Sequence, residues 1–205
     1  MRRVFASTFV SLDGVMQAPG GPGEDDSGGF AHGGWTVPHF DEAIGAAMGA
    51  VFSRPFSLLL GRKTYDIFAA HWPRAENGPD AQLAKLFNAA TKYVATKSTA
   101  PLRWQNSVPL HDAAADVPRL KQADGPDLLI QGSSDLIQTL LTHGLIDEFR
   151  LLVFPVVLGG GKRLFGAGAT GSALELVESR TSSTGVTICT YRPAGAVRTG
   201  SFALQ

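Results

Sequence analysis

The sequence predicts an α/β protein whose mixed, mostly parallel sheet carries helices on both faces and ends in an antiparallel hairpin. Apolar runs alternate with helical patterns over the first two thirds of the chain, which is typical of parallel sheets. Three of these runs, at 56–65, 92–98 and 127–134, pass directly into polar turns that contain glycine or lysine. Two later runs, Leu174–Arg180 and Val186–Tyr191, flank a polar turn and predict the hairpin.

The composition indicates one globular domain without a nucleic-acid surface. The chain has 205 residues, of which 44% are apolar and 18% charged, so it can bury one substantial core but hardly two. We expect the domain to cover residues 1–193 and a loose tail to cover 194–205. The net charge is zero and the basic residues are scattered, whereas general nucleic-acid binding needs a basic face.

Neither a metal site nor a membrane span is predicted. Cys189 is the only cysteine, and the alternating run around it predicts a buried, inert thiol. No apolar run approaches the roughly 20 residues of a membrane span, and the N-terminal residues do not form a signal peptide. We therefore expect a cytoplasmic protein. The five histidines show no metal-ligand spacing (His32, His39, His71, His111, His143).

The first strand is predicted from Val4 to Leu12, where Asp13 and Gly14 end it. From residue 15 to Trp35 the chain is rich in glycine, proline and acidic residues. Structureless loops longer than about 12–15 residues are uncommon in compact domains and are often functional. This segment is therefore either an active-site lid or a disordered insertion.

Helices are predicted between the strands. Pro38 opens the first helix, whose apolar positions at helical spacing predict a core-facing stripe (Phe40, Ile44, Met48, Val51). A short helix with Tyr65 and Phe68 follows the strand that ends at Leu60. Further helices are expected at 81–90, 118–123 and 136–143, and further strands around Tyr93 and at 107–110, 128–131 and 147–158.

The three polar strand ends predict a ligand with several phosphates, such as a phosphorylated dinucleotide. Ligands bind at the carboxyl ends of strands in open α/β sheets, and free N–H groups at a helix start favour an anion. Gly61 allows close approach of the backbone, and Arg62, Lys63 and Thr64 place donors at a helix start. An ordinary strand-to-helix turn with solvated charges is the alternative.

The other two strand ends add a cation and two hydroxyls. Lys97 can pair with a 2′-phosphate on the adenosine ribose, which would select NADPH over NADH. Gly132 permits close approach, while the serines after it either cap a helix or donate to a pyrophosphate. The predicted cofactor contacts at the three strand ends are Gly61, Arg62, Lys63, Thr64, Thr96, Lys97, Ser98, Gln131, Gly132, Ser133 and Ser134.

Several short motifs follow one another at defined spacing: Ser11–Gly14, Leu60–Tyr65, Thr96–Ser98, Gln131–Ser133, Asp147–Glu148 and Pro155–Lys162. Their order resembles the dihydrofolate reductase-like family, especially the branch of the riboflavin-biosynthesis reductase, the RibD C-terminal domain. The resemblance extends from Val4 to about Tyr191. It implies a three-layer dihydrofolate reductase-like fold, NADPH with further contacts at Ala6 and Gly14, and a homodimer paired through C-terminal sheet elements.

The resemblance places the nicotinamide and the substrate near Asp13, which either binds substrate or only shapes its turn. The segment Trp35–Pro38 is similar to the one that precedes the substrate-binding acid of dihydrofolate reductases, but His39 stands in the place of that acid and the nearest acid is Asp41. A plain helix N-terminus is the alternative there. The predicted catalytic residues are Asp13, His39 and Asp41, and the predicted substrate contacts are Asp13 and Trp35.

With this resemblance, the sequence predicts an NADPH-dependent reductase that transfers hydride to a C=N or C=O carbon. Its small-molecule substrate would be heterocyclic or sugar-derived, for example pterin, folate-like or pyrimidine ribitylamine-like. The alternative is a non-catalytic NADP(H)- or nucleotide-binding protein that keeps the fold. Gly159–Lys162 lacks the remaining residues of a phosphate-binding P-loop, and we expect it to form scaffold and a substrate-side wall.

Overall fold

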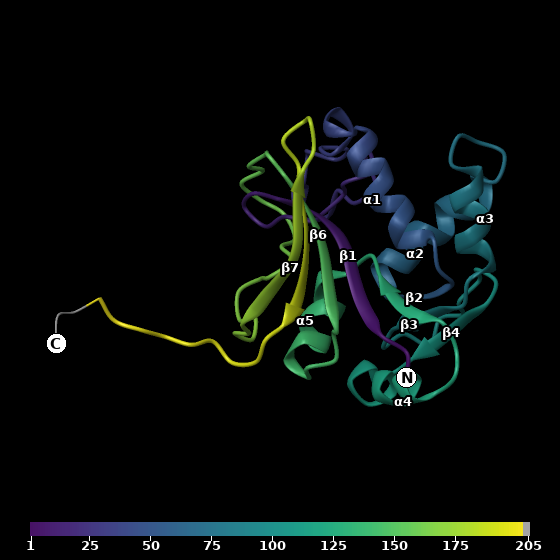
Figure 1. Ribbon diagram of the computed structural model, residues 1–205. Coiled ribbons are helices and arrows are strands. Elements are labelled where there is room, and N and C mark those ends of the chain that lie inside the picture. Colours follow the sequence, from purple (N-terminus) through teal and green to yellow (C-terminus); the bar gives the residue numbers. More distant parts are fainter. Residues whose placement is uncertain (203–205) are drawn as a thin grey trace.

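Within residues 1–202, which the computed structural model describes, eight strands form one sheet in the order β4-β3-β2-β5-β1-β6-β8-β7 (Figure 1). Strands β1 to β6 run parallel, and β8 and β7 add an antiparallel pair beside β6. The predicted mixed sheet with a C-terminal hairpin is confirmed. The strands are β1 (Val4–Ser11), β2 (Phe56–Gly61), β3 (Lys92–Ala95), β4 (Ser107–Leu110), β5 (Asp127–Ile130), β6 (Glu148–Phe154), β7 (Leu174–Thr181) and β8 (Thr187–Pro193).

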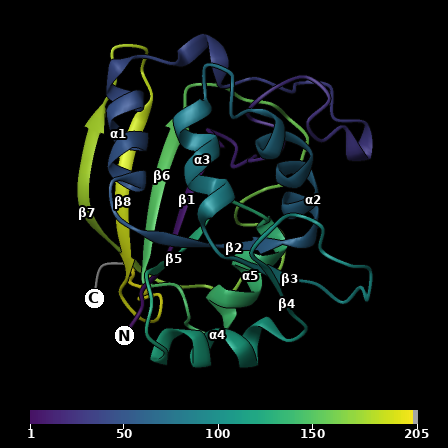
Figure 2. The ribbon, with the colours of Figure 1, turned by 90° about the vertical axis from the view of Figure 1, so that its right-hand side faces the viewer.

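Helices cover both faces of this sheet, because alternate residues of the central strands point to opposite sides. Leu59 of β2 packs toward α4 and α5, whereas Leu58 and Leu60 pack toward α1, α2 and α3. Figure 2 views the face that carries α1, α2 and α3. The helices are α1 (Glu42–Phe52), α2 (Arg62–His71), α3 (Ala81–Ala89), α4 (Ala113–Gln122) and α5 (Ser134–Thr142), with short 3-10 turns at Ser27–Gly29, Val37–His39 and Trp72–Arg74.

Two helices begin at residues other than those predicted, because an aspartate cap decides each start. Pro38 lies in a separate 3-10 turn, and α1 begins only after Asp41, whose carboxylate accepts a hydrogen bond from Ile44 N at 3.0 Å. Helix α4 begins five residues before Pro118, since Asp112 caps it through Ala115 N. In both places the start of the helix is set by an aspartate cap and not by the proline from which it was predicted.

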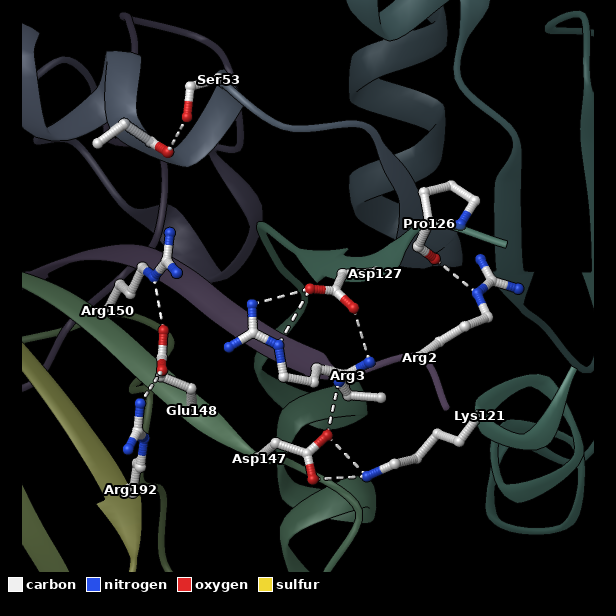
Figure 3. A network of polar contacts seen from close by, with 12 residues as sticks. Arg2, Arg3, Ser53, Lys121, Pro126, Asp127, Asp147, Glu148, Arg150 and Arg192 are labelled. Carbon is white, nitrogen blue, oxygen red and sulfur yellow. Dashed lines mark hydrogen bonds and ion pairs between the residues drawn. The ribbon is translucent and has the colours of Figure 1, made fainter. Parts of the chain in front are cut away.

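A polar network holds the amino ends of the central strands together, at the opposite end from the polar turns that follow β2, β3 and β5 (Figure 3). Asp127 at the start of β5 forms an ion pair with Arg3 at 2.9 Å. Asp147 accepts the backbone N–H of Val4 at 2.7 Å and an ion pair from Lys121, also at 2.7 Å. The aspartate of the Asp147–Glu148 motif thus fixes the register of β1 against β6.

The chain after β8 contributes no helix or strand up to residue 202, and Figure 1 shows it running away from the sheet. The predicted boundary at residue 193 coincides with the end of β8, while the last part of the predicted tail lies outside the described residues. Cys189 is buried, as predicted. Among residues 1–202 no group of acidic, histidine or cysteine side chains has a metal-site arrangement, and no helix could cross a bilayer.

Candidate functional site

A cleft with a volume of about 1820 Å³ opens at the carboxyl ends of the parallel strands. Its walls come from β1, the second half of α1, helices α2 and α3, the turns after β3 and β5, the starts of α4 and α5, and the loop 16–25. One part of the cleft is lined by the polar strand ends, and the part between β1 and α1 is lined mainly by apolar side chains. These two parts are called the strand-end half and the β1–α1 half below.

The three polar strand ends do come together in the strand-end half. Strands β3, β2 and β5 are neighbours in the sheet, so the turns that follow them stand side by side. Apart from Ser98, every predicted contact at these strand ends lines the cleft. Whether these residues bind a cofactor remains a prediction.

Two glycines allow the turns after β2 and β5 to interlock. A Cβ atom at Gly61 would overlap the Oγ of Ser133, and one at Gly132 would lie 2.9 Å from the Oγ1 of Thr64. Gly132 also has a φ of +138°, in the region that favours glycine. The sequence predicted that these glycines let a ligand approach the backbone closely. In the structure they let the turns after β2 and β5 approach each other.

The first turns of α2 and α5 present backbone N–H groups to this half of the cleft. The residues at their N-cap positions, Gly61 and Ser133, make no side-chain capping hydrogen bond. Helix α2 has no acidic residue in its first turn, whereas α5 carries Asp135 there. Because the N-terminus of a helix attracts anions, the start of α2 is the better place for a phosphate.

The cations of this half differ in how they are engaged. Arg62 is tied down by Asp66, with its Nε 2.9 and 3.0 Å from the two carboxylate oxygens. Lys97 is exposed and has no ion-pair partner among residues 1–202. His111, which sequence reasoning missed, also lines the cleft and lies 3.2 Å from the carbonyl oxygen of Thr96. Lys97 is thus the cation best placed to meet an added anion.

A buried aspartate fastens the glycine-rich loop across the cleft. Asp25 lies 2.6 Å from the Nζ of Lys162 and 3.4 Å from the Nζ of Lys63. Gln17 closes the same loop by donating to the carbonyl oxygens of residues 25 and 27, each at 2.9 Å. The loop that was predicted to be a lid or a disordered insertion is therefore a wall of the cleft with defined contacts.

The carboxylate of Asp25 is held in its charged form. Burial raises its pKa, but the hydrogen bonds from Lys162 and Ser27 and the charge of Lys162 outweigh burial and lower the pKa to about 2. Glu24 beside it behaves in the opposite way, because burial is the largest effect there and raises its pKa despite hydrogen bonds from Gly20 and Gly21. Both residues line the cleft, and no motif in the sequence indicated either of them.

Asp13 ties the end of β1 to the turn after β6. Its carboxylate accepts hydrogen bonds from the Ser11 hydroxyl at 2.6 Å and from the N–H groups of Leu158 and Gly159 at 3.1 and 2.9 Å. These bonds, that of Ser11 first, lower the pKa of Asp13 to about 2. Asp13 does not line the cleft, so the structure places it in a turn-shaping position, and its predicted catalytic role remains a prediction.

The other predicted catalytic and substrate residues also lie outside the cleft wall. Asp41 accepts the N–H of Ile44 as the cap of α1, and it also accepts the N–H and hydroxyl of Ser183 at 2.9 and 2.7 Å. The bond from Ile44 first, and then those from Ser183, lower the pKa of Asp41 to about 2. Trp35 is buried with its indole N–H on the carbonyl of Gln17. The ring of His39 lies edge-on to Phe154. Of the further predicted cofactor contacts, Ala6 is in the core and Gly14 is in the turn after β1; neither lines the cleft.

The β1–α1 half contains residues that the sequence assigned to the core or did not single out. Of the predicted core-facing stripe, Ile44 and Val51 are buried, but Phe40 and Met48 line the cleft. Helical spacing alone cannot distinguish a face that meets the sheet from one that stops at a cavity. The remaining residues of this half are Ser7, Thr8 and Phe9 of β1 and Gly49 and Phe52 of α1.

Comparisons with known proteins agree with this architecture. The family model of the RibD C-terminal domain matches residues 2–188. The uncharacterized protein YyaP of Bacillus subtilis (strain 168) is 32% identical over 192 residues, which are 93% of this chain and 94% of that protein. The uncharacterized protein YwjB of the same organism is 31% identical over 110 residues, 53% of this chain and 58% of that protein.

Solved structures show the same fold at low identity. A putative riboflavin biosynthesis protein from Shewanella sp. PV-4 has a TM-score of 0.58 at 22% identity, covering 93% of this chain and 98% of that one. Dihydrofolate reductase from Enterococcus faecalis, complexed with NADP(H) and RAB-propyl, has a TM-score of 0.59 at 13% identity, covering 94% and 96%. The fold is therefore dihydrofolate reductase-like, and the chain belongs to the RibD C-terminal domain family.

Proposed function

We propose that the protein is an NADPH-dependent reductase of small cyclic or sugar-derived compounds. The observation that carries this proposal is the meeting of three polar strand ends in one cleft, beside the uncapped start of α2 and the unpaired Lys97. The cleft is also large enough for a dinucleotide together with a second molecule. The NADP(H) complex of a protein with the same fold supports the choice of cofactor.

The strand-end half fits a dinucleotide phosphate. The first turn of α2 would hold the pyrophosphate through backbone N–H groups, with the hydroxyls of Thr64 and Ser134 beside it. Lys97 would meet the 2′-phosphate at the adenosine end. The cofactor supplies a hydride to the carbon of a C=N or C=O group, and the nitrogen or oxygen takes up a proton, which leaves NADP⁺. The chain positions the two molecules and excludes water between them.

The proton has several candidate sources on this chain. Glu24 lines the cleft, and its raised pKa keeps it nearer to the protonated form at working pH than an ordinary glutamate. Asp13, His39 and Asp41 remain proposed donors from the sequence. The lowered pKa of Asp13 and of Asp41 makes each a weaker proton donor than Glu24.

One observation favours a second function, that of a non-catalytic NADP(H)-binding protein. The aspartates expected to serve catalysis lie outside the cleft. Asp13 accepts hydrogen bonds that shape a turn, and Asp41 caps a helix and accepts hydrogen bonds from Ser183. A chain that kept the cofactor half while losing its proton donor would have this appearance. Both functions require that NADPH binds, so only a measurement of turnover can distinguish them.

The test is the oxidation of NADPH by the purified protein with a panel of dihydropterins, dihydrofolate and ribosylamino-pyrimidines. We expect substrate-dependent oxidation with at least one compound, and a fall of about 10²–10⁴-fold when the proton donor is neutralised, for example by Glu24→Gln. Tight binding of NADPH without oxidation in the whole panel would instead support the binding protein. Failure to bind NADPH would contradict both.

We also propose a homodimer in the cytoplasm. Val157, which follows β6, is 72% exposed, but the part of the apolar run 151–158 that lies in β6 is mostly buried inside the monomer and does not support a dimer. The hairpin does, since β7 is an edge strand with Leu176 and Val177 about half exposed, and unpaired edges readily pair with another chain. Light scattering should give twice the 21.6 kDa chain mass; a value near the monomer mass would contradict a dimer.

A further inference from the structure

The hydroxyl of Ser7 is a buried polar group without a partner in the cleft wall. Ser7 is 2% exposed, and no donor or acceptor among residues 1–202 lies within hydrogen-bond distance of its Oγ. Buried hydroxyls nearly always find a partner, because leaving one unpaired costs free energy. Ser7 nevertheless lines the cleft, in the middle of β1.

The surroundings of Ser7 form an apolar slot. Because side chains alternate along a strand, Ser7 shares its face of β1 with Phe5 and Phe9. Phe5 packs in the cluster that includes Phe52 of α1, and Phe9 packs in the cluster that includes Met48. Ser7 therefore faces the part of α1 between these two contacts. Phe40 closes the slot, with its ring centroid 5.9 Å from that of Phe9.

The neighbouring strand does not satisfy the Ser7 hydroxyl. The residue paired with Ser7 on β6 is Arg150. Its Nε binds Glu148 at 2.8 Å and its guanidinium lies over the ring of Phe5, 4.7 Å from the centroid. Figure 3 shows Arg150 directed at Glu148, which Arg192 also approaches. The cation that β6 places beside Ser7 is thus already paired.

The slot also lacks charge. Neither β1 nor α1 contributes a charged residue to the cleft wall among the described residues. The acids that line the cleft come from the loop, from α2 and from the segments at the starts of α3, α4 and α5. A ring that binds as a cation would meet no compensating carboxylate in the slot, and burying an unpaired charge is costly.

We propose that this slot binds an uncharged, flat ring edged by a carbonyl group, and that Ser7 determines specificity by donating a hydrogen bond to the carbonyl oxygen. The aromatic walls supply stacking and edge contacts, and the hydroxyl supplies the single directional contact. Naming this ring as the hydride acceptor rests on the reductase function proposed above. The slot itself and its preference for neutral rings do not.

The test compares two probes with the same bicyclic skeleton, the dioxo compound lumazine and 2,4-diaminopteridine, by calorimetry at pH 7 with NADP⁺ present and absent. We expect lumazine to bind more tightly. Ser7→Ala should weaken lumazine by about three- to tenfold, the usual effect of one hydrogen bond, and leave 2,4-diaminopteridine unchanged. Since the hydroxyl has no partner to lose, the thermal midpoint of Ser7→Ala should not fall. As a control, Ser57→Ala removes the Arg2 contact at 2.9 Å and should lower stability without changing lumazine binding.

A second pair of variants tests the slot without touching the hydroxyl. Gly45 and Gly49 both lie in α1, and a Cβ at either would meet no atom within 4 Å, but only Gly49 lines the cleft. Alanine at either position should raise the thermal midpoint, because alanine favours a helix more than glycine does. Only Gly49→Ala should weaken lumazine, because its methyl group occupies the slot. Equal effects of the two variants on binding would overturn the proposed position.

The outcomes separate this proposal from the reductase. Lumazine binding that depends on Ser7, without NADPH oxidation in any assay, would support the proposed slot and contradict the reductase function. NADPH-dependent turnover with lumazine binding unaffected by Ser7→Ala would reject the slot alone. Tighter binding of the diamino compound, or no lumazine binding at millimolar concentration, would also overturn the slot.

Discussion

The two halves of the cleft present different chemical groups to a ligand that would bind there. The strand-end half offers uncapped helix starts, an unpaired lysine, and two turns that pack closely at Gly61 and Gly132. The β1–α1 half offers aromatic and aliphatic side chains and one free hydroxyl. The first half can select charge, and the second can select shape and one hydrogen bond. If the proposed function is correct, cofactor and substrate specificity depend on separate residues, and variants should change them independently.

The loop 16–25 is where the two halves meet. Asp25 connects it to Lys63 at the start of α2 and to Lys162 after β6, so these two lysines are partly neutralised. This leaves Lys97 as the cation that can add most to affinity for a phosphorylated ligand.

The largest expected effect comes from removing that cation. Lys97→Ala should weaken NADPH by about 10- to 100-fold, because a charged hydrogen bond to the 2′-phosphate contributes about 1.5–3 kcal/mol. Binding of NADH and of ring probes should change little. Fluorescence titration with both cofactors measures the difference.

A matched control is Lys85→Ala, which removes the same charge from an exposed position on α3 outside the cleft. It should leave both cofactors unaffected. An equal loss for NADPH and NADH in Lys97→Ala would show that Lys97 does not contact the 2′-phosphate, and would weaken the assignment of charge selection to the strand-end half.

A smaller effect, on stability, is expected from the loop that joins the halves. The folded-state pKa of Asp25 is lowered from 3.8 to about 2, so its contribution is present above pH 3.8 and is lost as the pH falls toward 2. Linkage gives a contribution of about 2 kcal/mol to the free energy of unfolding at neutral pH. Urea unfolding between pH 6 and pH 3 should therefore show a smaller acid-induced loss for Asp25→Asn than for the unchanged chain.

Asp26→Asn serves as the control for this measurement, because Asp26 is exposed and makes no ion pair among residues 1–202. It should retain the acid-induced loss of the unchanged chain. If both variants lose stability equally on acidification, the Asp25 contacts do not hold the loop in solution. The lowered pKa values of Asp13 and Asp41 contribute a further loss in every one of these proteins.

The sheet, the hairpin and the meeting of the strand ends could be predicted from local features of the sequence. Apolar runs such as 56–60 and 128–130 are fully buried because central parallel strands have helices on both sides, and this composition is visible locally. Turn chemistry is local too, so Gly61 and Gly132 could be singled out. Parallel strands then bring their carboxyl ends to one edge, which places Lys97 and Ser134 on one cleft without knowledge of other contacts.

Which acids and strand hydroxyls face the cleft, by contrast, depends on contacts between residues far apart in the sequence. Asp25 meets Lys162 across 137 residues of sequence, and Asp13 meets Gly159 across 146. Such pairs leave no local pattern, because a carboxylate has the same sequence signature whether it binds a ligand or a distant backbone N–H. Ser7 was hidden for the same reason. Whether a strand hydroxyl is paired depends on what the neighbouring strand and the facing helix place beside it, and here Arg150 turns to Glu148 while α1 presents Gly49.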